Sequence, residues 1–190
     1  NAAQREVVHT AGQQEHQEPP AVPIQPPRDL PAIIDIEASG FGHGSYPIEI
    51  GAVLPDGSAF CTLIRPEAAW THWDAHAAAA THRIERDLLL RYGRGVVNVT
   101  QMLNDRLRGL SVLCDGWAHD FVWLNLLFDA AERVPLFRLD DLRSVLTPEQ
   151  AAAWHDTREQ VLAESGLLRH RASSDARILQ TTLMRLRSPR

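Results

Sequence analysis

Two acidic residues interrupt a short apolar segment, residues 32–37, that has the pattern of a buried β-strand. Because successive side chains of a strand point to opposite faces, Asp35 and Glu37 project from one face and Ile34 and Ile36 from the other. Two carboxylates on a buried face repel each other unless a cation lies near them, so the pattern indicates a divalent metal site. By itself, however, the pair also fits a solvated strand edge.

The composition is typical of a globular protein with a sizeable core. The chain has 190 residues, of which 44% are hydrophobic and 23% charged, and no apolar run approaches a membrane span. No secretory signal is evident, so we expect a cytoplasmic protein that does not associate with membranes. Cys61 and Cys114 lie in apolar stretches and are expected to be buried, reduced thiols. The net charge of −5 argues against a broad basic surface for duplex nucleic acid.

The chain divides into an N-terminal tail and one domain. Residues 1–29 are rich in Gln, Glu and Pro without an apolar period, which is typical of a tail or linker, and the domain is expected to cover residues 30–190. Three strands are predicted first, at 32–37, 48–54 and 59–64, and the turn residues 55–57 join the last two into a hairpin.

Helices and strands are predicted to alternate after this hairpin. We expect a helix at 97–110, a strand at 111–114, a helix beginning near 120, a weak strand at 137–139, and two final helices, one through 161 and one at 172–186. This order predicts an α/β fold in which helices cover a mixed sheet that opens with antiparallel strands.

Two further acids occupy core-facing positions of the predicted helices. Asp120 lies on the same helical stripe as Leu124, and Asp175 on the same stripe as Leu179. Either acid alone fits an ordinary helix start. Together with the strand pair, they indicate one site built from four carboxylates.

His170 precedes Asp175 by five positions, so the two side chains would not share a face of one continuous helix. We therefore expect His170 in the loop before the last helix. There its imidazole could take a proton from water, because an unperturbed histidine titrates near neutral pH.

Three motifs follow one another over residues 31–186. The first is Asp35-Ile-Glu37-Ala38-Ser39-Gly40, continued by residues 47–53; the second is residues 112–120, ending at Asp120; the third is His170-x-Ala-x-x-Asp175. In this order they resemble the DEDDh 3′-to-5′ exonucleases, the family of the proofreading subunit of bacterial replicative polymerases, ribonuclease T and oligoribonuclease. The combination is far more specific than any single motif.

The resemblance implies a ribonuclease H-like fold with a mixed five-stranded sheet, whose first three strands are antiparallel, flanked by helices. It implies two divalent ions, Mg²⁺ or Mn²⁺, held by Asp35, Glu37, Asp120 and Asp175, with His170 as general base. Oxygen-only ligands suit these ions better than Zn²⁺. The implied activity is hydrolysis from the 3′ ends of single-stranded DNA or RNA, releasing nucleoside 5′-monophosphates.

The same resemblance suggests residues that bind the terminal nucleotide. Ala38, Ser39 and Gly40 are expected to contact it through the segment after the first motif. Phe41 is the candidate wedge that stacks on a base, although a single aromatic equally often packs within its loop. His82 resembles the family's loop histidine near the bound 3′ end.

Some positions depart from the family pattern. Gly116 and His119 replace an asparagine and an aromatic residue before Asp120, so Asp115 is a rival metal ligand, whereas Asp129 lies too far along the helix. Arg83 and Arg171 are weaker candidates for phosphate contacts.

Other functions and assemblies stay open. The alternative is a non-catalytic nucleic-acid-binding or scaffold module, and a domain of a larger polymerase-associated protein also fits. DNA and RNA are not distinguished by any local pattern. Monomer and homodimer are both open, because Trp70, Trp73 and the alanine run after His76 fit either an interface or the core.

Overall fold

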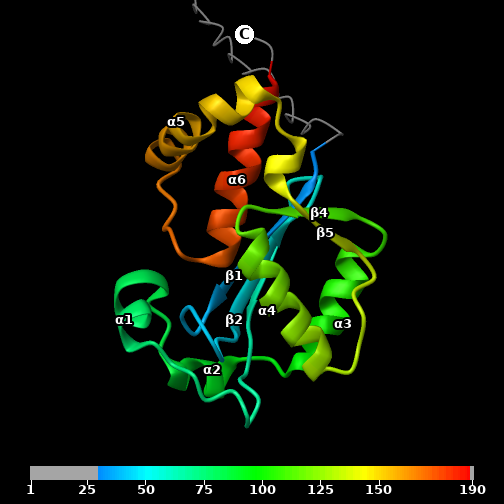
Figure 1. Ribbon diagram of the computed structural model, residues 1–190, viewed down its shortest axis with the longest axis vertical. Coiled ribbons are helices and arrows are strands. Elements are labelled where there is room, and N and C mark those ends of the chain that lie inside the picture. Colours follow the sequence, from blue (N-terminus) through cyan, green and yellow to red (C-terminus); the bar gives the residue numbers. More distant parts are fainter. Residues whose placement is uncertain (1–29, 189–190) are drawn as a thin grey trace, which may run out of the picture.

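The computed structural model describes residues 30–188, in which one mixed sheet carries helices on both faces (Figure 1). The strand order is β3-β2-β1-β4-β5. Strands β1, β2 and β3 pair antiparallel, whereas β4 and β5 run parallel to β1. The predicted sheet is therefore confirmed, and the predicted tail at 1–29 lies outside the described residues. The strands are β1 (Ala32–Ala38), β2 (Pro47–Val53), β3 (Ala59–Leu63), β4 (Ser111–Cys114) and β5 (Arg138–Asp141).

The helices agree with the predicted order but include three short segments that were not predicted. The predicted helices are α3 (Val96–Leu107), α4 (Trp117–Ala130), α5 (Pro148–Ser165) and α6 (Ala172–Arg187). The additional segments are α1 (Ala75–Ala77), which continues into the π-helical turn η1 (Ala78–His82), α2 (Arg86–Tyr92) and the 3₁₀ turn η2 (Leu142–Val145). The α3 helix ends before residue 110 because Gly109 adopts a left-handed conformation, with φ +74°.

The two faces of β1 pack against different helices. Ile34 and Ile36 belong to the larger core, which α3 and α4 cover, whereas Ile33 packs with residues of α6 such as Leu179. The alternation of a strand therefore places Asp35 and Glu37 on the α6 face, as predicted.

The start of α6 lies directly against the backbone of β2. Gly51, the register partner of Asp35, makes this possible, because a Cβ atom at this position would collide with the backbone of Ala172 and Ser173. The close approach brings the first turn of α6, which carries Asp175, beside the end of β1.

Two side-chain environments differ from the sequence-based expectations. Cys114 is buried, as predicted, but Cys61 is exposed, because it lies on the edge strand β3, in which no residue is buried. Trp70 is buried and stacks on Tyr46 with ring centroids 5.4 Å apart, which places it in the core rather than at an interface.

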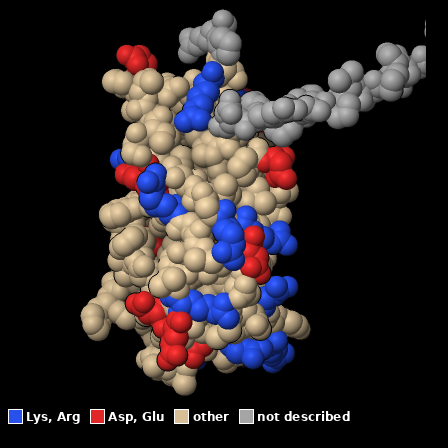
Figure 2. Space-filling view, turned by 90° about the vertical axis from the view of Figure 1, so that its right-hand side faces the viewer, with Lys and Arg blue, Asp and Glu red and all other residues tan. Residues whose placement is uncertain are grey.

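Charged side chains are mixed over the surface drawn in Figure 2, where arginines alternate with acids. Such a surface agrees with the net charge of −5 and offers no single broad basic face in that view. Among residues 30–188, no helix is both long enough and apolar enough to cross a membrane.

Candidate active site

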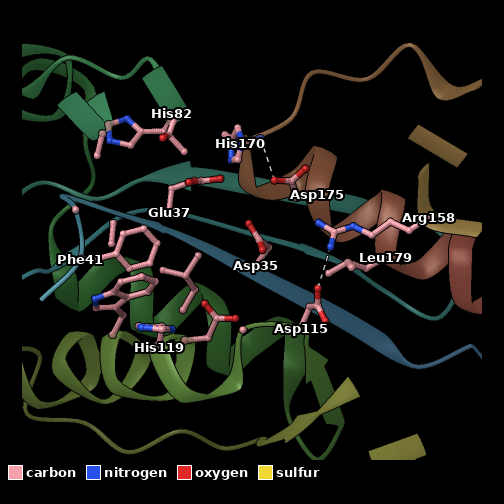
Figure 3. Close-up of a pocket in the computed structure, with 18 residues that line it drawn as sticks. Asp35, Glu37, Phe41, His82, Asp115, His119, Arg158, His170, Asp175 and Leu179 are labelled. Carbon is pink, nitrogen blue, oxygen red and sulfur yellow. Dashed lines mark hydrogen bonds and ion pairs between the residues drawn. The ribbon is translucent and has the colours of Figure 1, made fainter. Parts of the chain in front are cut away.

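A cleft of about 510 Å³ opens at the carboxyl ends of β1 and β4, and it gathers most of the predicted site residues (Figure 3). Such an edge is where ligands bind in many α/β folds, because loops and helix starts converge there. The predicted residues that line it are Asp35, Glu37, Ala38, Gly40, Phe41, His82, Asp120, His170 and Asp175. The sequence therefore predicted the members of one cleft from segments that are more than 100 positions apart.

The pKa of Asp35 depends on all three of the other predicted acids. Burial raises the pKa of its carboxyl well above the ordinary value, and the negative charges of Asp120, Glu37 and Asp175 raise it further. The other three predicted ligands therefore all act on Asp35, although the four come from β1, α4 and α6.

The other three carboxylates are also held in unfavourable surroundings. Burial raises the pKa of Glu37 to about 7 and that of Asp120 to about 7, and it raises the pKa of Asp175. For Glu37 the charge of Asp175 adds to burial. The ionised form of such buried carboxylates is stabilised when a cation binds between them.

Three ligand atoms come particularly close together in this cleft. Glu37, His170 and Asp175 each offer one ligand atom, and these atoms all lie within 4.8 Å of one another. The backbone N–H of His170 donates to the Asp175 carboxylate at 2.9 Å, and His170 has a left-handed backbone with φ +60°. This arrangement fixes His170 in the loop before α6, where the sequence placed it. The oxygen-rich donor set fits a hard divalent cation.

The two rival acids of the second motif have different surroundings. Asp120 is buried, and its charge is the largest electrostatic contribution from another residue to the raised pKa of Asp35. Asp115 also lines the cleft, but one of its carboxylate oxygens accepts a hydrogen bond from Arg158 at 3.2 Å. Asp129 is exposed near the other end of α4. These positions favour Asp120 as the fourth carboxylate of the cluster.

Ser39 is the predicted site residue whose side chain does not line the cleft. It is fully buried, its hydroxyl forms a hydrogen bond with His72 Nδ1 at 2.9 Å, and the same oxygen accepts the N–H of Tyr46 at 3.1 Å. The hydroxyl therefore holds the turn after β1, while the neighbouring Ala38 and Gly40 face the cleft.

An aromatic wall forms one side of the cleft. Phe41 is 68% exposed; its ring meets His119 edge-on, with centroids 5.4 Å apart, and lies 6.0 Å from Trp123. His119 and Trp123 are themselves 5.6 Å apart. Neither of these two was predicted as a site residue, although His119 lies in the second motif and Trp123 follows His119 four residues later on the same helix.

His82 presents a buried hydrogen-bond donor to the cleft. The side chain is 3% exposed, and burial lowers its pKa, which favours the neutral ring. Because Nδ1 accepts the N–H of Ile84 at 3.1 Å, the neutral ring carries its proton on Nε2. No described residue accepts from Nε2, so this group is available to a ligand.

The two arginines considered as phosphate contacts lie elsewhere, whereas a third arginine lines the cleft. Arg171 is bound to Glu49, with its shortest contact at 2.6 Å, and Arg83 lies in a separate surface depression. Arg158 of α5, which was not among the predicted site residues, also lines the cleft. Its spacing of three from the buried Val161 is a signal that could have placed it on the inner face.

Solved structures of exonuclease I share this architecture. One covers 82% of this chain, with a TM-score of 0.62 and 12% identity; E. coli exonuclease I in complex with a 5cy-dA13 oligonucleotide covers 84%, with a TM-score of 0.61 and 16% identity. A moderately thermophilic exonuclease I from Methylocaldum szegediense covers 84%, with a TM-score of 0.58 and 12% identity. The chain has the exonuclease I fold. The predicted resemblance to 3′-to-5′ exonucleases is thereby confirmed for the fold.

The similarity with exonuclease I covers only part of those proteins. The chain spans about two fifths of their length, 40%, 41% and 41% in the three structures above. No protein-family model matches the chain, and no curated protein matches it by sequence. What the shared exonuclease fold does in this chain must therefore be argued from its own residues.

The raised pKa values predict how the metal-free protein responds to pH. The folded state keeps protons on Glu37 and Asp120 up to about pH 7, whereas the unfolded chain releases them near 4.5 and 3.8. The stability associated with these protons is fully present below the lower values and is lost as the pH rises towards 7. We expect the melting temperature in EDTA to fall by roughly 5–10 °C between pH 5 and 8.

Thermal unfolding across that pH range, with EDTA or with Mg²⁺, measures this effect. Mg²⁺ is expected to raise the melting temperature more at pH 8 than at pH 5, because the ionised carboxylates bind it. A melting temperature in EDTA that stays constant or rises from pH 5 to 8 would contradict the prediction.

Proposed function

We propose that the protein is a metal-dependent 3′-to-5′ exonuclease that acts on the 3′ ends of single-stranded DNA or RNA. In this proposal Asp35, Glu37, Asp120 and Asp175 hold two divalent ions, Mg²⁺ or Mn²⁺. When bound, such ions lower the pKa of water and neutralise charge that develops on the phosphate. His170 removes the proton of the attacking water, and nucleoside 5′-monophosphates leave one at a time.

One observation carries the proposal: four carboxylates and an imidazole, drawn from three distant segments, meet in a single cleft. Burial raises the pKa of every one of these carboxyl groups, and for Asp35 and Glu37 the negative charges of other acids in the cluster raise it further. Without cations such a cluster would also repel the phosphates of a nucleic acid, so binding alone does not account for it. A metal-dependent phosphodiester hydrolase does account for it.

The aromatic wall supports a single-stranded substrate. Bases of any identity can stack on Phe41 once they are splayed out of a duplex, and His119 and Trp123 extend the same wall. The buried Nε2–H of His82 adds a donor for a sugar or phosphate oxygen of the terminal nucleotide. One of the exonuclease I structures with this fold was solved with a 5cy-dA13 oligonucleotide. We propose that the present chain also acts on single-stranded oligonucleotides, either DNA or RNA.

Digestion of 5′-labelled single-stranded DNA and RNA of one sequence tests the function directly. We expect a ladder that shortens from the 3′ end with Mg²⁺ or Mn²⁺ and disappears with EDTA, and the faster substrate identifies the preferred sugar. A substrate labelled at the 3′ end should lose its label in the first turnover. Absence of a ladder on both strands, together with retained oligonucleotide binding, would favour the non-catalytic binding module instead.

Replacing Phe41 with alanine (Phe41→Ala) tests the stacking role. Stacking of a base on an aromatic side chain contributes about 1–3 kcal/mol, so affinity for a single-stranded oligonucleotide should fall about 10- to 100-fold. Fluorescence anisotropy in Ca²⁺, which slows turnover in many Mg²⁺-dependent hydrolases, measures this affinity. Tyr92→Ala is the matched control, because Tyr92 is 70% exposed and lies away from the cleft. Equal affinity of wild type and Phe41→Ala would exclude Phe41 as the wedge.

A further inference from the structure

Arg158 reaches the cleft from a helix that is otherwise largely exposed. Among the residues of α5, Val161 is the buried one, and Arg158 lies one turn before it on the same face. The Arg158 side chain is only 28% exposed and extends its guanidinium toward Asp35 and Asp115 (Figure 3). Among the described residues that line the cleft, it is the only arginine.

The ion pair that Arg158 forms is incomplete on both sides. Its Nη1 donates to Asp115 Oδ2 at 3.2 Å, and this is the one hydrogen bond that Arg158 makes within residues 30–188. A guanidinium has five N–H donors, so most of them are free. Asp115 Oδ1 is buried and has no partner among the same residues. Such unsatisfied buried groups often lie where a ligand completes the network.

A second arginine–carboxylate pair provides a comparison, because both oxygens of its carboxylate accept hydrogen bonds. Arg171 donates three times to the two oxygens of Glu49, at 2.6–3.2 Å, and the N–H of Ala172 also donates to Glu49. Glu49 is almost fully buried, so this pair holds the loop before α6 against β2. Arg158 and Asp115 lack such a full set of hydrogen bonds, which argues against a purely structural role.

The positive charge of Arg158 changes the pKa of two acids of the cluster. It lowers the pKa of Asp35 and of Asp175, in opposition to burial, which raises both. The guanidinium therefore lies within electrostatic reach of the carboxylates that would hold the metal ions. A phosphate bound to those ions would lie close to the free donors of Arg158.

We propose that Arg158 binds the phosphate under attack and that Asp115 orients its guanidinium, an inference that rests on the exonuclease function proposed above. The planar fork of arginine matches two phosphate oxygens at once. Negative charge on these oxygens increases as water attacks, so the contact strengthens in the transition state. Arg158 would therefore affect turnover more than ground-state affinity.

Steady-state kinetics on a 5′-labelled single strand with Mg²⁺ tests this role. Arg158→Gln is expected to lower kcat about 100-fold and to raise KM by no more than about tenfold. Arg158→Lys keeps the charge but loses the fork, and it should recover about a tenth of the wild-type rate. Asp115→Asn should lose less activity than Arg158→Gln, because it leaves the guanidinium in place.

The control variant is Arg177→Gln on α6, which removes the same charge from an exposed arginine outside the cleft. It should keep the wild-type kcat, and all four variants should melt within about 4 °C of wild type. Wild-type kcat in Arg158→Gln would overturn the inference. So would an Asp115→Asn variant that is as slow as Arg158→Gln, because the pair would then act only as a unit of structure.

Binding of thymidine 5′-monophosphate with Mg²⁺, measured by calorimetry, separates this inference from the proposed function. Loss of about tenfold in affinity in Arg158→Gln supports the phosphate contact even if the wild type has no turnover, an outcome that refutes the exonuclease alone. If the wild type digests DNA but neither kcat nor nucleotide affinity depends on Arg158, the inference fails and the exonuclease stands. If the wild type neither digests DNA nor binds the nucleotide, both fail.

Discussion

Replacing Asp35 with asparagine (Asp35→Asn) is expected to abolish metal-dependent hydrolysis and to raise the melting temperature of the metal-free protein. The first effect follows because Asp35 lines the cleft with the other three carboxylates, whose negative charges act on it. Loss of metal-ion catalysis removes several kcal/mol of transition-state stabilisation, so the rate should fall at least about 1,000-fold. The second effect follows because burial and three neighbouring acids raise the pKa of the Asp35 carboxyl. A neutral amide of the same shape removes that repulsion.

Single-turnover digestion with Mg²⁺ and thermal unfolding in EDTA at pH 8 measure the two effects on one preparation. Asp56→Asn is the matched control, because Asp56 is an exposed acid in the turn between β2 and β3, and hydrogen bonds from Ser58 lower its pKa. This variant should keep full activity and should not gain stability. Full activity of Asp35→Asn would refute the two-metal proposal.

Opposite signs for activity and stability are informative, because simple damage to the fold would lower both. A site that functions only with bound cations keeps like charges close together in their absence, and the metal-free protein is less stable as a result. The same reasoning extends to Glu37 and Asp120, whose pKa values near 7 make the effect grow between pH 5 and 8.

The sheet was predictable because its signals are local. Period-two alternation identifies β1, and the turn residues after β2 specify the hairpin with β3. The segments that sequence reasoning missed have weak local signals. In α2 only Leu89 is buried, and α1 with η1 is an alanine-rich segment whose one buried side chain is His82. Tertiary contacts, rather than an apolar period, hold both in place.

The acidic cluster was predictable for a different reason. An acid on the apolar stripe of a helix conflicts with its surroundings, and Asp120 and Asp175 both show that conflict. For Arg158 this conflict between residue and surroundings is less clear, because α5 has little apolar periodicity and a long arginine side chain can reach water from many positions. Ser39 was predicted as a site residue, but its position could not be read from the sequence. Only the fold reveals that its hydroxyl contacts His72 and not the cleft.

The aromatic wall depends on tertiary structure more than any other part of the cleft. Three of the five strands, β2, β3 and β4, lie between Phe41 and Trp123 in the sequence. Contact between Phe41 and Trp123 requires the turn after β1 to lie against α4. A hydrogen bond from Trp123 Nε1 to Ser45 Oγ at 3.0 Å holds this turn. No spacing rule in one sequence predicts such a contact, so the wall appears only when both elements are placed.

The second large effect is expected at His170, where replacement by alanine (His170→Ala) should lower kcat about 100- to 10,000-fold. Its ring lies with Glu37 and Asp175, where a water molecule held by the cluster would be within reach. The same closeness leaves His170 two roles, since an imidazole within 4.8 Å of two carboxylate ligands can also bind a metal ion. These roles differ in which measured quantity changes.

Calorimetric titration of Mn²⁺ into wild type and His170→Ala, combined with kcat, separates the two roles. A general base accounts for a large loss in kcat with unchanged metal affinity and with partial rescue by added imidazole. A ligand accounts for weaker metal affinity and for a kcat that recovers at high Mn²⁺. His155→Ala, which removes an exposed histidine of α5, should change neither quantity. We expect the first pattern, because the four carboxylates already supply oxygen ligands that suit these ions, which leaves the imidazole free to accept the proton of water.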